Sequence, residues 1–167
     1  MAHSKLDDVI SHWDCLLEGF HCSTQQFYDV VEQAIAKRKI PDTQVSRVEL
    51  YESGFLSAKR LYLRVWRKNH FFDICGAPFG NSFFFSWWLS EPPIGCFGIC
   101  LALPLLDKIA WVFAPRMTYF KYDTALMFQE SVHSAVLEVV DHVSKTKGIR
   151  ALSEGERKPV MRNFFDR

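Results

Sequence analysis

The chain has 167 residues, of which 49% are hydrophobic, 15% aromatic and 23% charged, and its formal net charge is +1. Intrinsic disorder needs low hydrophobicity and high net charge, so this composition excludes disorder for most of the chain. Glycine and proline follow no fixed period, which excludes collagen-like and repeat architectures. The net charge gives no general attraction to nucleic acid, and the length suits one domain over residues 1–167.

We expect residues 1–40 to form a helical hairpin. Hydrophobic residues between Leu6 and Phe20 recur at steps of three and four, the spacing of an amphipathic helix. Ser23 and Gln26 have the spacing of a capping box, which predicts that a second helix begins there. Pro41 ends this second helix.

Residues 45–90 are predicted to form an antiparallel β-meander, with strands at 45–52, 59–68, 71–75 and 82–89 separated by short turns. In the second of these strands, apolar and polar side chains alternate. The apolar face holds Leu61, Leu63 and Val65. The opposite face is basic and aromatic and consists of Arg60, Tyr62, Arg64, Trp66 and Lys68.

Residues 94–114 form an apolar segment in which the first thirteen residues carry no charge. A membrane-spanning helix needs about 20 apolar residues, and runs of about 10–14 are more typical of core, interfacial or re-entrant segments. Pro104 and the charged pair Asp107 and Lys108 also argue against a span. The segment is therefore buried core, a subunit interface or membrane-inserted, and the sequence does not decide among these.

Residues 117–148 are expected to form a fifth strand at 117–122 and then a long helix that ends at Gly148. Residues 149–167 form a C-terminal tail, in which Ser153 and Glu156 predict a short capped helix. The predicted fold class is α+β. It combines the helical hairpin, a four- to five-stranded antiparallel meander, the apolar insertion and the long C-terminal helix packed on the sheet.

No motif in the sequence specifies a reaction, so we expect a non-enzymatic protein with no catalytic residue, no metal site and no cofactor. Glu130 and His133 have the spacing of a carboxylate-bridged metal pair, but the second copy that such a site needs is missing. We expect His133 on the solvated side of its helix. The sequence has five cysteines and no visible secretory signal, which favours reduced thiols and a cytoplasmic location. Within the cytoplasm, the protein could also attach to the surface of a membrane.

The predicted function is a membrane-peripheral or complex-embedded interaction module, because residues 82–113 carry more apolar surface than one small sheet can bury. Its partner would be a membrane surface or a protein, with self-association as a further option, and nucleic acid is not expected. The side chains predicted to bind an anionic surface are Arg60, Arg64, Lys68, Tyr62 and Trp66. The predicted membrane or partner anchors are Trp87, Trp88, Ile94, Leu103 and Trp111.

Two alternatives remain open. Aromatic side chains could line a pocket for an apolar small molecule or lipid in a soluble α+β domain. The basic and aromatic strand face could instead stack single-stranded RNA bases on Tyr62 and Trp66, with Arg60 and Arg64 at the phosphates.

Overall fold

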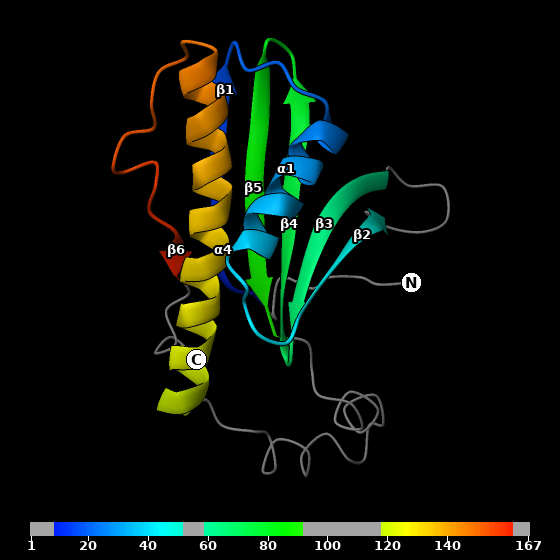
Figure 1. Ribbon diagram of the computed structural model, residues 1–167, viewed down its shortest axis with the longest axis vertical. Coiled ribbons are helices and arrows are strands. Elements are labelled where there is room, and N and C mark those ends of the chain that lie inside the picture. Colours follow the sequence, from blue (N-terminus) through cyan, green and yellow to red (C-terminus); the bar gives the residue numbers. More distant parts are fainter. Residues whose placement is uncertain (1–8, 52–58, 92–117, 162–167) are drawn as a thin grey trace, which may run out of the picture.

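A computed structural model describes residues 9–51, 59–91 and 118–161. These residues form a six-stranded antiparallel sheet and two helices (Figure 1). The elements, in chain order, are β1 (Val9–Glu18), α1 (Thr24–Lys37), β2 (Thr43–Tyr51), β3 (Lys59–Arg67), β4 (His70–Phe79), β5 (Ser82–Ser90), α4 (Tyr119–Thr146) and β6 (Val160–Met161). The α+β class predicted from the sequence is confirmed.

The strands lie in the order β2-β3-β4-β5-β1-β6. Strands β2 to β5 are neighbours both in sequence and in space, which confirms the predicted meander. β1 pairs with β5 along nearly all of its residues, on the side of β5 away from β4. The connection through α1 therefore takes the chain from β1 to β2 at the opposite edge of the sheet. β6 adds two residues to the outer edge of β1.

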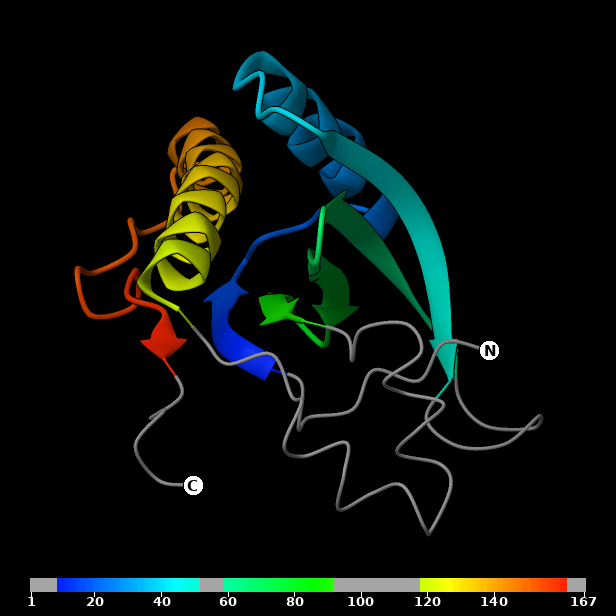
Figure 2. The ribbon, with the colours of Figure 1, turned by 90° about the horizontal axis from the view of Figure 1, so that it is seen from below.

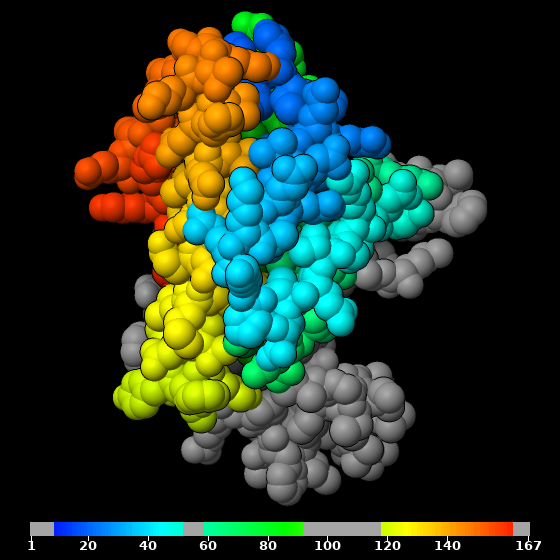
Figure 3. Space-filling model, in the orientation of Figure 1, coloured from blue at the N-terminus to red at the C-terminus, as the bar shows by residue number. Residues whose placement is uncertain are grey.

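Both helices lie on one side of the curved sheet, which we call the inner face (Figure 2). The two helices also contact each other (Figure 3). Arg38 after α1 forms an ion pair with Glu138 of α4. The packing of the long C-terminal helix on the sheet is therefore confirmed. The core between these layers is strongly aromatic, and its largest fully buried side chains include Trp13, Phe20, Phe27, Tyr28, Phe72, Phe83, Phe85, Trp87 and Phe128.

The sheet opens between β3 and β4, and Tyr28 of α1 fills the opening. The pairing of these strands runs from Arg67 and His70 to Leu63 and Ile74 and ends there. Beyond that point the Tyr28 hydroxyl donates to the carbonyl of Leu61 at 2.7 Å and accepts from the amide of Gly76 at 3.2 Å. A Cβ atom at position 76 would lie 2.3 Å from the ring of Phe27, so glycine is what allows α1 to approach this closely.

The prediction of a first helix in the N-terminal hairpin is wrong, because Val9–Glu18 form strand β1. Burial follows a period of two, with Trp13, Cys15 and Leu17 buried and the residues between them exposed. The apolar residues of this segment fit both a helical and a strand period, and nine residues of β1 find partners on β5. Ladder hydrogen bonds and burial against β5 decide the conformation. The second helix is confirmed as α1, with its capping box between Ser23 and Gln26.

Two further expectations at the C-terminal side need correction. Most of the residues predicted as a fifth strand, at 117–122, form the first turn of α4 instead. The Thr118 hydroxyl accepts from the amide of Lys121 and caps the helix there. The amide of Ser153 donates to the Glu156 carboxylate and the amide of Glu156 donates to the Ser153 hydroxyl, as in a capping box, but the chain forms only turns there. The carboxylate of Glu156 also accepts from Arg150, which fixes this turn without a helix.

Candidate interaction site

The basic and aromatic side chains of β3 lie on the side of the sheet away from the helices, which we call the outer face. Leu63 and Val65 are fully buried on the inner face, as the alternation predicts. Their neighbours on the outer face are Arg60, Tyr62, Arg64 and Trp66. Lys68 is not among them, because β3 ends at Arg67 and Lys68 occupies a turn with a φ of 50°. Its expected position on the strand face is thereby corrected.

Arg64 is not available to an anionic ligand. Its guanidinium donates to both carboxylate oxygens of Asp73 on β4, at 2.6 and 2.7 Å. The two side chains are only 14% and 3% exposed, and the guanidinium also lies 4.5 Å from the centre of the Phe71 ring. The charge of Arg64 is therefore neutralised inside the molecule, which corrects its predicted role.

The other outer-face side chains of β3 differ in accessibility. Trp66 stacks on Phe71 with ring centres 5.4 Å apart, and it remains 36% exposed. Tyr62 is partly buried, and burial raises the pKa of its hydroxyl. Arg60 is exposed. Of the four, Arg60 and Trp66 are the most accessible to a partner.

The buried cysteines of the sheet are poor nucleophiles. Cys75 of β4 is buried on the outer face, and burial raises the pKa of its thiol, although Arg60 opposes the shift. Burial likewise raises the pKa of Cys15 on β1 to about 11. Since the thiolate is the reactive form, neither side chain is prepared for catalysis.

The adjacent residues Trp87 and Trp88 lie on opposite faces of β5. Trp88 stacks on His12 of β1 at the outer face, with ring centres 4.9 Å apart, and is half-buried. Trp87 is fully buried on the inner face, so its predicted role as a surface anchor is corrected. His12 was not predicted at this face, because β1 was expected to be a helix.

Trp87 instead holds His133 of α4. The indole N–H donates to His133 Nδ1 at 3.1 Å, which places the imidazole proton on Nε2, where it donates to the carbonyl of Arg157 at 2.7 Å. Burial lowers the pKa of this imidazole. His133 is therefore a neutral core residue, and the expectation of a solvated position is wrong. Glu130 is exposed and accepts from Ser134, and in the described ranges no group of His, Cys, Asp and Glu could hold a metal ion.

The end of β5 and the start of α4 lie at the same end of the molecule, which we call the basal end. Strand pairing brings the start of β2, the β3–β4 turn and the end of β5 to this end. The first turn of α4 also lies toward this end of the molecule (Figure 1), and the charges of Lys121 and Glu91 both influence the pKa of His70. The residues of the basal end are Asp42, Arg67, Lys68, His70, Glu91, Thr118, Tyr119, Phe120 and Lys121.

The basal end exposes aromatic surface beside positive charge. Tyr119 and Phe120 are 93% and 80% exposed. Lys68 forms an exposed pair with Asp42 at 3.6 Å. The imidazole of His70 is buried, and burial lowers its pKa, with Arg67 and Lys121 adding to the effect. No sequence pattern distinguished Tyr119 and Phe120, because both were assigned to a strand.

The remaining predicted anchors, Ile94, Leu103 and Trp111, lie outside the described residues. No helix in the described part of the chain has the length and apolar composition needed to cross a bilayer. No protein-family model, curated protein or solved structure matches this chain.

Proposed function

We propose that the protein is a membrane-peripheral interaction module that meets an anionic lipid surface with its basal end. The observation that carries this proposal is the exposure of Tyr119 and Phe120 at the point where the chain returns from the apolar segment 94–114. Aromatic side chains are favoured at the interface between lipid and water.

The two flanks of the apolar segment support the same orientation. β5 ends at Ser90 and α4 begins at Tyr119, and both points belong to the basal end. A segment that leaves and re-enters the domain at one end can contact a surface there without crossing it. Lys68, Arg67 and Lys121 at this end suit anionic headgroups, each cation near such a surface contributing about 1 kcal/mol.

Vesicle flotation tests the proposal with the full-length chain. The vesicles are phosphatidylcholine alone, and phosphatidylcholine with phosphatidylglycerol in equal parts. We expect binding to the anionic vesicles, weakened by salt, because exposed charges are screened. Replacing Tyr119 and Phe120 together with serine should weaken binding at least about tenfold, since burying one aromatic side chain contributes about 1.5–3 kcal/mol.

Phe79 provides the matched control, because it is 73% exposed and lies at the end of β4 opposite the basal end. Phe79→Ser should leave vesicle binding unchanged. Leu103→Asp tests the apolar segment separately, since a carboxylate in lipid costs about 2.5–3.5 kcal/mol. Failure of the parent chain to float with either vesicle would reject a lipid surface and leave a protein partner as the ligand of this end.

A further inference from the structure

The two edges of the sheet are protected very differently. At one edge, β6 pairs with Ser11 and His12 of β1, and the Trp13 indole donates to the carbonyl of Glu156 at 2.6 Å. At the other edge, β2 pairs with β3 on one side, and the described ranges place no strand on its second side. The described part of the C-terminal segment thus covers the β1 edge.

The backbone of β2 also lacks the features that prevent edge pairing. Its nine residues contain no proline or glycine, and their register against β3 runs without a bulge. Residues 44–47 are exposed in succession. A long, regular and accessible edge strand offers its unpaired amides and carbonyls to another strand.

We propose that β2 pairs antiparallel with β2 of a second copy of this chain, about a two-fold axis at Val48. This register places Arg47 of each copy opposite Glu49 of the other. Val45 then faces Tyr51, and Ser46 faces Leu50. Opposite charges on directly paired residues stabilise antiparallel strands.

The neighbouring symmetric registers are excluded by charge. Centring the pair on Arg47 places two arginines opposite each other, and centring it on Glu49 places two glutamates opposite each other. Like charges in directly opposed positions are destabilising. A shift by a single residue would place the helices of the two copies on opposite faces of the joint sheet and would pair inner-face with outer-face side chains.

The ion pairs that Arg47 and Glu49 make within one copy do not prevent this exchange. Arg47 bonds to Asp29 and Glu32 of α1, and Glu49 lies 3.7 Å from Lys59. All of these side chains are at least 32% exposed, and exposed pairs contribute little. Redirecting them across the dimer therefore costs little.

Register-specific crosslinking is the first test. In this register the two Val48 Cβ atoms lie about 4.5–5.5 Å apart, close to what a disulfide requires. Under mild oxidation the full-length Val48→Cys variant should yield a covalent dimer, with the 48–48 linkage identified by mass spectrometry of the joined peptides. Val45→Cys should not link to itself, because Val45 faces Tyr51 of the second copy. An equal yield of self-linked peptide from both variants would overturn the register.

The second test exchanges the charges at positions 47 and 49. Sedimentation equilibrium measures the dissociation constant of the dimer. Glu49→Arg should raise it about tenfold, because each dimer then holds two arginine pairs in direct opposition. The double variant Arg47→Glu with Glu49→Arg should restore dimerisation. Glu18→Arg makes the same charge change at an exposed position of β1 and should have no effect.

A parent chain that sediments as a monomer at every concentration, with no 48–48 linkage, would overturn the proposal. So would a double variant that dimerises no better than Glu49→Arg alone while retaining the parent far-UV circular dichroism spectrum. Neither measurement uses lipid. Failure to dimerise would therefore not contradict the membrane proposal, and failure to bind vesicles would not contradict the dimer.

Discussion

Arg64 and Trp66 lie two residues apart on the same face of β3, and their neighbours give them different roles. The guanidinium of Arg64 is held by Asp73 in a nearly buried pair. Trp66 stacks on Phe71 and keeps an accessible face. A residue type on a strand face is therefore insufficient evidence for a binding role, because the directly opposed residue decides whether its charge is free.

We predict that Arg64→Met lowers the free energy of unfolding by about 3–5 kcal/mol, because it leaves the Asp73 carboxylate buried without its partner. Urea denaturation followed by circular dichroism measures this loss. The double variant Arg64→Met with Asp73→Leu should recover most of it, since a buried ion pair can be replaced by apolar groups at little cost. Arg47→Met, which removes only exposed pairs, should cost less than about 1 kcal/mol, and an equal loss in Arg47→Met and Arg64→Met would contradict the buried pair.

His133 should make stability depend on pH. Burial lowers the pKa of this imidazole in the folded state. Below about pH 6.5 the unfolded chain therefore binds a proton at His133 that the folded chain does not bind. Stability is thus fully present above pH 6.5 and falls as the pH is lowered, by up to about 1.4 kcal/mol per pH unit for each such histidine. His70, whose pKa burial also lowers, adds to this slope.

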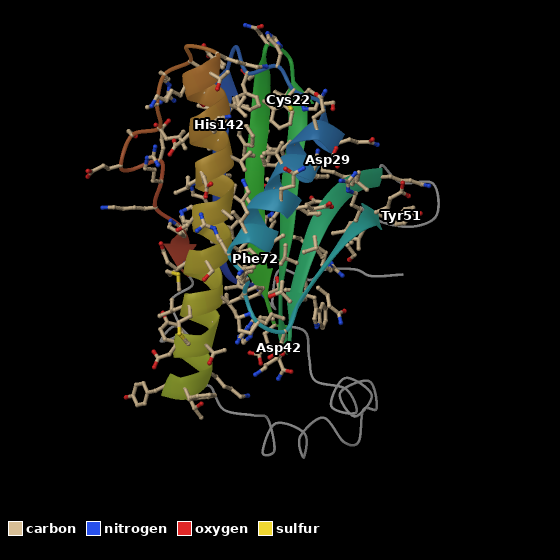
Figure 4. All side chains as sticks on the ribbon, viewed as in Figure 1. Cys22, Asp29, Asp42, Tyr51, Phe72 and His142 are labelled. Carbon is tan, nitrogen blue, oxygen red and sulfur yellow. The ribbon has the colours of Figure 1, made fainter. Side chains whose placement is uncertain are left out.

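His133→Gln tests this expectation, because glutamine offers an acceptor and a donor without a titrating group. Denaturation at a series of pH values between 5 and 7 should show a shallower slope in this variant. His142→Gln is the control, since His142 is exposed on the same helix (Figure 4). A slope that is the same in all three proteins would show that His133 is not held neutral by the fold.

At the scale of elements, α1 and β1 illustrate what the sequence can and cannot predict. The start of α1 is specified locally by Ser23 and Gln26, so its position was predictable. β1 carries apolar residues that fit two periods, and its conformation depends on β5, about seventy residues later in the chain. The four meander strands were predicted in the right order from local patterns and short turns, but β4 continues to Phe79, beyond the predicted end at residue 75.

The candidate site was predictable only in part, for the same reason. The two-residue turn at 68–69 fixes the register of β3 against β4, so the opposition of Arg64 and Asp73 was accessible from the sequence. The inward position of Trp87 and the outward position of Trp88 were not, because β5 has bulky residues at successive positions. Tyr119 and Phe120 could not be assigned before the start of α4 was known.

Tyr28 should be the most important single link between α1 and the sheet. Tyr28→Phe removes the hydroxyl that serves both the Leu61 carbonyl and the Gly76 amide. Each buried backbone group left unpaired costs about 1–3 kcal/mol, so we expect a total loss of about 2–4 kcal/mol. The Gly76 amide should also exchange faster with deuterium. Tyr119→Phe, at an exposed position, should change neither quantity, and slow exchange at Gly76 in Tyr28→Phe would contradict the bridging role.

For the whole molecule, the lipid-binding end and the dimer strand constrain each other. β2 runs away from the basal end, from near Asp42 toward Tyr51 (Figure 4). Antiparallel pairing of two β2 strands therefore points the two basal ends in opposite directions. A dimer cannot place both ends on one flat bilayer, but it can hold two bilayers at once.

The combined expectation is that the parent chain clusters anionic vesicles, whereas Glu49→Arg binds them equally well but clusters them less, because its dimer is weaker. Light scattering of vesicles made of phosphatidylcholine and phosphatidylglycerol in equal parts measures the clustering, and flotation in the same samples measures the binding. The variant with Arg47→Glu and Glu49→Arg should recover clustering, because it restores opposite charges across the axis. Replacing Tyr119 and Phe120 with serine should abolish both signals, since it acts at the lipid contact rather than at the dimer. Undiminished clustering by Glu49→Arg would show that the two bilayers are held by something other than paired β2 strands.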